Sequence, residues 1–245
     1  MHRMFSIVIS LAHFCDKHGP RIISVTQSAE KGTLGEELLV PDYPTESYCE
    51  SCLLQFPEES TRSMRCFIED VPFITTQYSS IRYQLLNSII KRAFSEETMI
   101  YDNMPFIFFD DLRGLNLVIG FKLYDENARG NERRYCFILT VDSRSHDDSM
   151  KMLSEHWNFI IGGFDKMIAY IKNIHKSEFL GKNKTVENNL ETLNNNAFIG
   201  SYLRANKSKF GRNLVSLTDD KFLFVRIHKW NSFLLHTVMN ENKLP

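Results

Sequence analysis

LNLVIGFKLYDENARGNERRYCFILTVD, residues 115–142, is the stretch that decides the fold of this chain. Apolar side chains occupy every odd position from Leu115 to Leu123, which is the period of a strand with one face on a core. The same alternation returns from Tyr135 to Val141 and predicts a second, antiparallel strand. Residues 125–133 between them have no apolar period, so they predict a solvent-exposed hairpin loop on a rigid support.

The composition limits the class of protein. A chain of 245 residues can bury a sizeable core as one large domain, and two full domains are less expected. Its 29 Lys and Arg against 30 Asp and Glu give a net charge of -1, which argues against nucleic acid as a partner. We expect a soluble, intracellular protein, because no signal-peptide pattern and no apolar run of about 18 residues occurs.

The five cysteines are an odd number, and in an intracellular protein they are expected to be reduced thiols. One group of possible metal ligands lies in a single predicted hairpin turn and comprises His13, Cys15, Asp16 and His18. Four ligands crowded into one turn do not easily converge on a tetrahedral ion. A second group is the pair Cys49 and Cys52, which without a second pair is only half of a zinc site. The sequence therefore predicts no metal and no cofactor.

Three further segments complete a predicted five-stranded, mainly antiparallel sheet. Phe5–Leu11 and Arg21–Gln27 read as strands from their apolar pattern. Pro105–Phe109 is wholly apolar, as expected of a central strand buried on both faces. Residues 28–80 show neither apolar alternation nor a continuous apolar run, so they predict a long irregular loop.

Two apolar stripes at helical spacing predict helices that flank this sheet. They cover Ile81–Phe94 and Asp147–Asn173, and Trp157 is expected in the core. The fold class is therefore α/β, in its α+β form, over residues 1–175.

The chain after residue 175 is expected to hold a polar linker and a tail helix. Residues 176–212 are polar and rich in Asn, which is typical of a linker. An apolar stripe within residues 213–245 predicts a helix that begins at the N-cap Thr218. Its apolar face, with Phe222, Trp230 and Phe233, can pack either on the core or on a partner.

This order of elements resembles that of a longin domain. Several segments, taken in order, also resemble the folliculin family: His13-Phe14-Cys15-Asp16-Lys17-His18-Gly19-Pro20-Arg21, Cys49 with Cys52, Ile107-Phe108-Phe109, Ala128-Arg129-Gly130 with Tyr135, and Leu214–Asp220. The family pairs a longin domain with a C-terminal DENN domain. The chain looks like the short fungal form, which has the longin part only.

The resemblance implies a GTPase-activating subunit that supplies an arginine in trans and is not a stand-alone enzyme. Its implied partners are a folliculin-interacting longin/DENN protein, as a heterodimer, and a Rag-type GTPase pair as substrate. Its implied place is the cytoplasm, with peripheral recruitment through partners to the vacuolar or lysosomal membrane, in amino-acid signalling to the target-of-rapamycin kinase. Arg129 matches the family's catalytic arginine, whereas Arg133 and Arg134 do not. Asn131 and Arg134 replace aromatic residues of the family's arginine loop.

Three functions stay open at this point. The first is GTPase activation through Arg129, and the second is a non-catalytic longin scaffold in membrane traffic or permease sorting. The third is a metal or thiol enzyme built on the Cys and His positions. Hydrolysis measured with and without the protein separates the first two, and the metal content of the purified protein tests the third.

Overall fold

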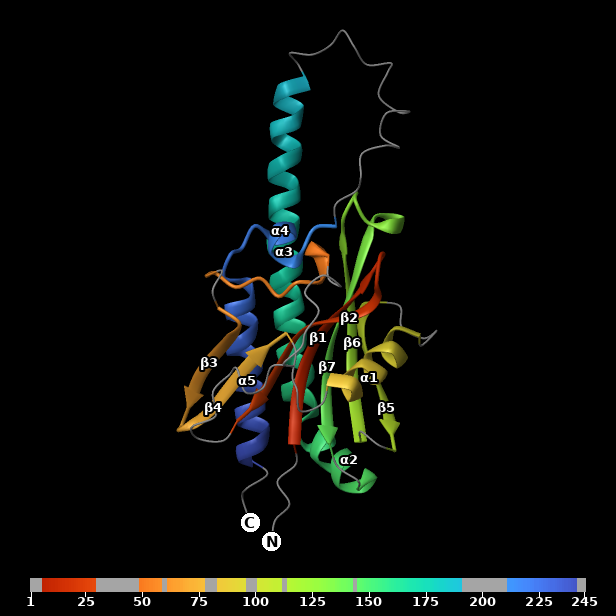
Figure 1. The fold of residues 1–245 in the computed structure, drawn as a ribbon, viewed down its shortest axis with the longest axis vertical. Coiled ribbons are helices and arrows are strands. Elements are labelled where there is room, and N and C mark those ends of the chain that lie inside the picture. Colours follow the sequence, from red (N-terminus) through yellow and green to blue (C-terminus); the bar gives the residue numbers. More distant parts are fainter. Residues whose placement is uncertain are drawn as a thin grey trace.

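An antiparallel sheet of seven strands is the centre of the fold (Figure 1). The computed structural model describes residues 6–29, 49–58, 61–77, 83–95, 101–111, 114–142, 145–190 and 211–241, with the backbone alone for 83–85, 181–190 and 241. The strands are β1 (Ser6–Cys15), β2 (Gly19–Ser28), β3 (Ser63–Ile68), β4 (Val71–Thr76), β5 (Asp102–Asp110), β6 (Gly114–Tyr124) and β7 (Glu132–Asp142). Their order across the sheet is β3-β4-β2-β1-β7-β6-β5.

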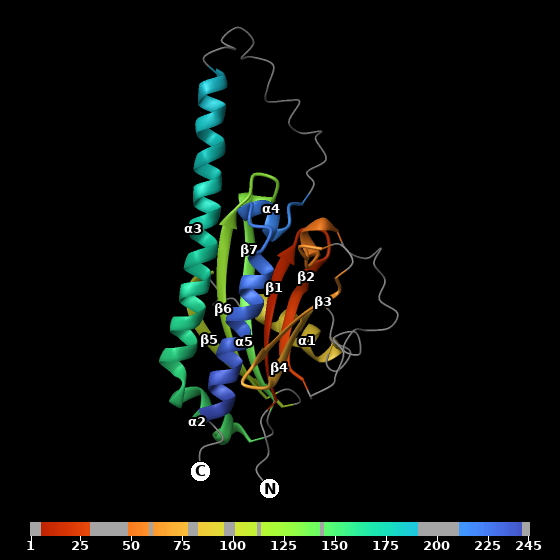
Figure 2. The same ribbon diagram turned by 90° about the vertical axis from the view of Figure 1, so that its left-hand side faces the viewer.

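Helices cover both faces of this sheet (Figure 2). They are α1 (Tyr83–Ser95), α2 (His146–Glu155), α3 (Trp157–Leu190), α4 (Leu214–Thr218) and α5 (Leu223–Glu241), with short 3-10 turns η3 (Glu50–Cys52) and η4 (Arg129–Asn131). α1 packs over Val118 and Ile138 on one face, and the other helices pack over Phe121 and Phe137 on the other face. The predicted α/β class and its antiparallel sheet are therefore confirmed.

The β6–β7 hairpin confirms the two strands predicted from residues 115–142. The expectation that all of residues 125–133 face solvent is wrong, because Asp125 is fully buried and Arg133 is only 3% exposed. An ion pair between these two side chains is the reason that both can leave water.

Two strands lie within residues 28–80, so the prediction of an irregular loop is wrong for that part. The hairpin of β3 and β4 raises the strand count from the expected five to seven. Glu69 and Asp70 form its turn with φ of 46° and 66°, where a Gly or Asn usually marks such a turn. β3 lies at a sheet edge, where of its six side chains only Met64 is buried and the apolar Phe67 is exposed, so its sequence shows no clear apolar alternation. Residues 30–48, 59–60 and 78–80 lie outside the described residues.

The apolar segment Pro105–Phe109 lies at the opposite end of the strand order, within β5. Met104 and Ile107 are 67% and 37% exposed, so the prediction of a strand buried on both faces is wrong. A short apolar run predicts a strand but carries no information about which other strand will lie beside it.

The two predicted flanking helices are present, but the second one is divided. α1 confirms the helix predicted over Ile81–Phe94, within its described part. His156 interrupts the second helix with φ -104° and ψ 9°, and α3 continues to Leu190 through residues expected to be linker. Trp157 is only half-buried at the margin of the core, so its expected central place is wrong.

The tail packs on the same core as the rest of the chain. Asn213, not Thr218, caps the first tail helix, because its Oδ1 accepts a 2.7 Å hydrogen bond from the Ser216 N–H. Thr218 lies in the last turn of α4, and α5 begins five residues later. The buried apolar side chains of α5 are Leu223, Phe224, Ile227, Leu234, Leu235, Val238 and Met239. Phe222 and Phe233 remain exposed on the outer side of this helix.

Candidate functional site

Arg129 lies at the tip of the β6–β7 hairpin, in a loop with a closed backbone. The Asp125 N–H donates to the Asn131 carbonyl at 3.0 Å, and the Ala128 N–H donates to the Asp125 carbonyl at 2.9 Å. Gly130 has φ 70°, a left-handed conformation that glycine adopts without strain. The local hydrogen bonds therefore set the direction in which Arg129 leaves the hairpin.

A second hairpin supports the same loop. The Arg129 N–H donates a 3.0 Å hydrogen bond to Oδ2 of Asp16, which lies in the turn between β1 and β2. This contact exists because β1 and β7 are neighbours in the sheet, with His13 opposite Tyr135. The backbone of Arg129 is thus held both by its own loop and by the β1–β2 turn.

The base of the loop is anchored by a buried carboxylate. Asp125 accepts a 2.8 Å hydrogen bond from Arg133 Nε and bonds of 3.0 and 2.6 Å from Arg212. Burial alone opposes ionisation of this carboxyl, but the two guanidinium groups hold its pKa below the usual range. Because Arg212 precedes α4, this cluster also ties the tail to the hairpin.

The three arginines of this hairpin have different environments. Arg133 forms the buried ion pair with Asp125. The Arg134 guanidinium lies 5.4 Å from the ring centroid of Tyr101. Arg129 is exposed, and among the described residues its guanidinium has no ion-pair partner. Of these three side chains, Arg129 is therefore the one with neither an ion pair nor an aromatic contact among the described residues.

Arg129 stands between two hollows of the surface. One has a volume of about 390 Å³ and is lined by Phe14, Asp16, Gly130, Glu132 and Arg134 as well as Arg129. The other, of about 380 Å³, connects Arg129 to Cys15, Lys17, Cys49 and Ser51. The second hollow joins the arginine loop to a cluster of sulfur ligands.

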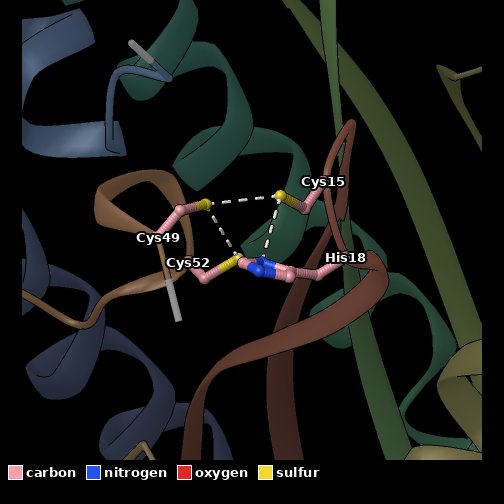
Figure 3. Close-up of side chains that lie close together, drawn as sticks. All are labelled: Cys15, His18, Cys49 and Cys52. Atoms are coloured by element: carbon pink, nitrogen blue, oxygen red, sulfur yellow. Dashed lines mark hydrogen bonds between the residues drawn. The ribbon is translucent and has the colours of Figure 1, made fainter. Parts of the chain in front are cut away.

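That cluster consists of Cys15, His18, Cys49 and Cys52 (Figure 3). Their Sγ and imidazole nitrogen atoms all lie within 4.8 Å of one another. The expectation that Cys49 and Cys52 lack a second pair is wrong, because the fold brings the β1–β2 turn against η3. Of the four possible ligands in that turn, only Cys15 and His18 belong to the cluster. The detectable signal was the matching spacing of Cys15-x-x-His18 and Cys49-x-x-Cys52.

The other two members of the predicted hairpin group have different roles. The Nε2 of His13 lies 3.3 Å from Cys52 Sγ, outside the set of four, and Asp16 turns toward the Arg129 backbone. Full burial lowers the pKa of His13 to about 4, so its imidazole is neutral.

The thiols of Cys15 and Cys52 differ in pKa. Hydrogen bonding from Cys52 lowers the pKa of the Cys15 thiol, and the same contact raises the pKa of Cys52. Cys15 is therefore the first of these two thiols to ionise.

None of the helices in the described part of the chain combines the length and apolar character needed to cross a membrane.

Comparisons with known proteins identify the family. Residues 71–238 match the family model of folliculin, described as a vesicle coat protein involved in Golgi to plasma membrane transport. A protein of Saccharomyces cerevisiae, Protein LST7, is 99% identical over 242 residues, which are 99% of this chain and 100% of that protein. The arginine loop, the cysteine pair and the tail helix thus lie in a chain that belongs to the folliculin family.

Proposed function

We propose that this chain is the GTPase-activating subunit of a folliculin-type complex and that Arg129 is its catalytic residue. The observation that carries this proposal is the exposed guanidinium of Arg129, which forms no ion pair with the part of the chain that the structure describes, on a backbone fixed by Asp16. The substrate would be a Rag-type GTPase pair, and the complex would include a folliculin-interacting longin/DENN partner. Its place would be the vacuolar or lysosomal membrane, in amino-acid signalling to the target-of-rapamycin kinase.

The chemistry of GTP hydrolysis explains why such an arginine is useful. Negative charge spreads over the transferring phosphoryl group in the transition state, and an activator contributes positive charge at that point. A guanidinium is always protonated and offers a rigid fork of donors to phosphate oxygens. A lysine provides a single, more strongly hydrated point charge, so it is a poor replacement.

The position of Arg129 suits insertion into a second protein. Its neighbours Ala128 and Gly130 add little bulk, and the loop projects from the end of two paired strands (Figure 1). Because two hairpins fix the backbone, little backbone conformational entropy is lost when the guanidinium enters a nucleotide pocket.

Single-turnover GTP hydrolysis by the GTPase pair, with saturating reconstituted complex, tests this function. We expect Arg129→Ala to lower the stimulated rate by about 10³–10⁵-fold without weakening assembly of the complex. Arg129→Lys should recover little of the rate. Arg134→Ala is the matched control, since it removes an exposed charge five residues away in the same hairpin, and it should retain most of the activity.

A second candidate function is supported by the description of the family. A vesicle coat protein involved in Golgi to plasma membrane transport need not accelerate hydrolysis, and a longin scaffold would act through its surface alone. Full stimulation by the Arg129→Ala complex, together with normal permease sorting in cells, would favour this scaffold function over the catalytic one.

A further inference from the structure

We propose that Cys15, His18, Cys49 and Cys52 bind one structural zinc ion, and that this ion braces the turn that holds Arg129. The zinc site itself does not depend on the proposed GTPase activation. Its effect on Arg129 rests on that function and is tested separately below.

Four of the six distances between the ligand atoms are close to the edges of a zinc tetrahedron, and the other two are within 4.8 Å (Figure 3). Zinc bonds of about 2.3 Å to sulfur and about 2.0 Å to nitrogen place tetrahedral sulfurs roughly 3.8 Å apart and sulfur and nitrogen roughly 3.6 Å apart. Cys49 Sγ lies 3.5 Å from Cys15 Sγ and 3.6 Å from Cys52 Sγ. His18 Nδ1 lies 3.7 and 3.5 Å from the sulfurs of Cys15 and Cys52. The four side chains are therefore already placed around one point.

The kind of ligand selects the metal and its role. Three thiolates and one imidazole are soft donors, which favour zinc over magnesium or calcium. A closed set of four protein ligands leaves no position for a substrate or water, so the ion would be structural. This reasoning also makes a metal enzyme at these positions unfavourable.

The surroundings of the sulfurs suit thiolates bound to a metal. Ser51 Oγ lies 3.0 Å from Cys49 Sγ and can donate its proton to that sulfur. His13 Nε2, at 3.3 Å from Cys52 Sγ, is placed for the same role. Such outer contacts orient the ligands of a metal site and adjust their basicity. Lys17 and Arg133 line the adjoining hollow and offset the net negative charge of three thiolates on one divalent ion.

The two halves of the site come from segments that are distant in the sequence and already touch through pairs such as Cys15 and Ser51. Cys15 ends β1 and His18 lies in the β1–β2 turn, whereas Cys49 precedes η3 and Cys52 is the last of its three residues. A zinc ion would close the long connection between them and fix η3 against the sheet. Asp16 lies between two of the ligands and accepts the Arg129 N–H, so the ion also restrains the support of that arginine.

Metal analysis of the full chain, purified with reducing agent and dialysed, is the first test. We expect elemental mass spectrometry to find one zinc ion per chain. X-ray absorption spectroscopy at the zinc edge should show that the ion is bound by three sulfur atoms and one nitrogen atom. Cobalt exchanged for zinc should give the intense visible bands of a tetrahedral thiolate site. These three readouts use the wild-type protein, so they do not depend on whether a variant folds.

Variants then assign the ligands. Cys52→Ser and His18→Ala should lose the bound zinc and lower the midpoint of thermal unfolding, and a chelator should lower the midpoint of the wild type but not of these variants. Cys66→Ser is the matched control, because Cys66 lies in β3 outside the cluster, and it should retain one zinc. Absence of zinc from the wild type, iron with a visible cluster spectrum, or a Cys49–Cys52 disulfide in fresh protein would each overturn the zinc site.

The link to Arg129 is tested in the reconstituted GTPase complex. Asp16→Ala should retain zinc yet lower the stimulated single-turnover rate at saturating complex, whereas Asp16→Asn, which keeps an acceptor oxygen, should restore it. If wild-type protein binds zinc but stimulates no hydrolysis, the proposed activation fails and the zinc site stands. If the Asp16→Ala complex is fully active although activity requires Arg129, the proposal that Asp16 and the zinc ion support the Arg129 backbone is wrong.

Discussion

The backbone N–H of Arg129 donates a 3.0 Å hydrogen bond to the Asp16 carboxylate, although 113 positions separate the two residues in the chain. The bond joins the tips of two hairpins that are neighbours because β1 pairs with β7. A loop braced from outside its own hairpin holds its exposed side chain in a narrower range of positions than a free loop does. The position of Arg129 therefore depends on residues from both hairpins.

Removal of the Asp125 carboxylate should unfold the base of the arginine loop. Asp125→Ala leaves the Arg133 guanidinium buried without its partner and should cost about 3–5 kcal/mol of unfolding free energy. Urea titration followed by circular dichroism measures this loss. Glu126→Ala is the control in the same loop, since that side chain is exposed, and a similar loss in both variants would contradict the buried ion pair.

The adjacent glycines of α3 should respond in opposite directions to alanine. A Cβ on Gly163 would lie 2.6 Å from Cδ2 of the buried Leu234 in α5, whereas a Cβ on Gly162 meets nothing within 4 Å. Gly162→Ala should stabilise the protein by up to about 1 kcal/mol through helix propensity. Gly163→Ala should destabilise it, since overpacking costs about 1–3 kcal/mol. Equal thermal midpoints for the two variants would argue against close contact of α3 with α5.

Truncation of Trp157 should cost less than truncation of a central aromatic residue of the same helix. Phe164 is fully buried against Phe137, so Phe164→Ala should cost about 3–5 kcal/mol. Trp157 is half-buried at the margin of the core and keeps part of its contact with water in the folded state. Chemical denaturation of both variants gives the comparison, and a larger loss for Trp157→Ala would place the indole in the core after all.

Acid should weaken the contact between α5 and the sheet through His228. Its Nδ1 lies 2.7 Å from Thr75 Oγ1, and burial, aided by Lys229, lowers its pKa to about 4. A neutral imidazole in the folded state means that stability is full above pH 6.5 and falls as the pH drops toward about 4. The loss levels off at roughly 3 kcal/mol, at 1.36 kcal/mol for each pKa unit.

Unfolding free energies of the wild type and His228→Asn between pH 4 and pH 7 measure this contribution. The asparagine keeps a polar atom near Thr75 but does not titrate, so the variant should lose less stability on acidification. His13 has a pKa lowered to about the same value, so only the difference between the two proteins reports on His228. Identical pH profiles would show that His228 does not titrate in this window.

The sequence by itself was enough to predict the β6–β7 hairpin, the exposed Arg129 at its tip and the folliculin family. Alternation of apolar residues is a local property, so it was enough to locate the two strands and the loop between them, but not the burial of Asp125 and Arg133 at the base of that loop. The same local reasoning missed β3, β4 and the break at His156, and it placed the strand at Pro105–Phe109 in the centre of the sheet although β5 lies at its edge.

Only the tertiary structure decided which distant side chains meet. The spacing of Cys15 and His18, and of Cys49 and Cys52, is visible in the sequence, but their convergence depends on how the β1–β2 turn packs against η3. The burial of Asp125 likewise depends on guanidinium groups from β7 and from the segment before α4. The apolar period of a segment indicates which of its side chains face the core and which face water. Which distant segments come into contact is set by the packing of all segments at once.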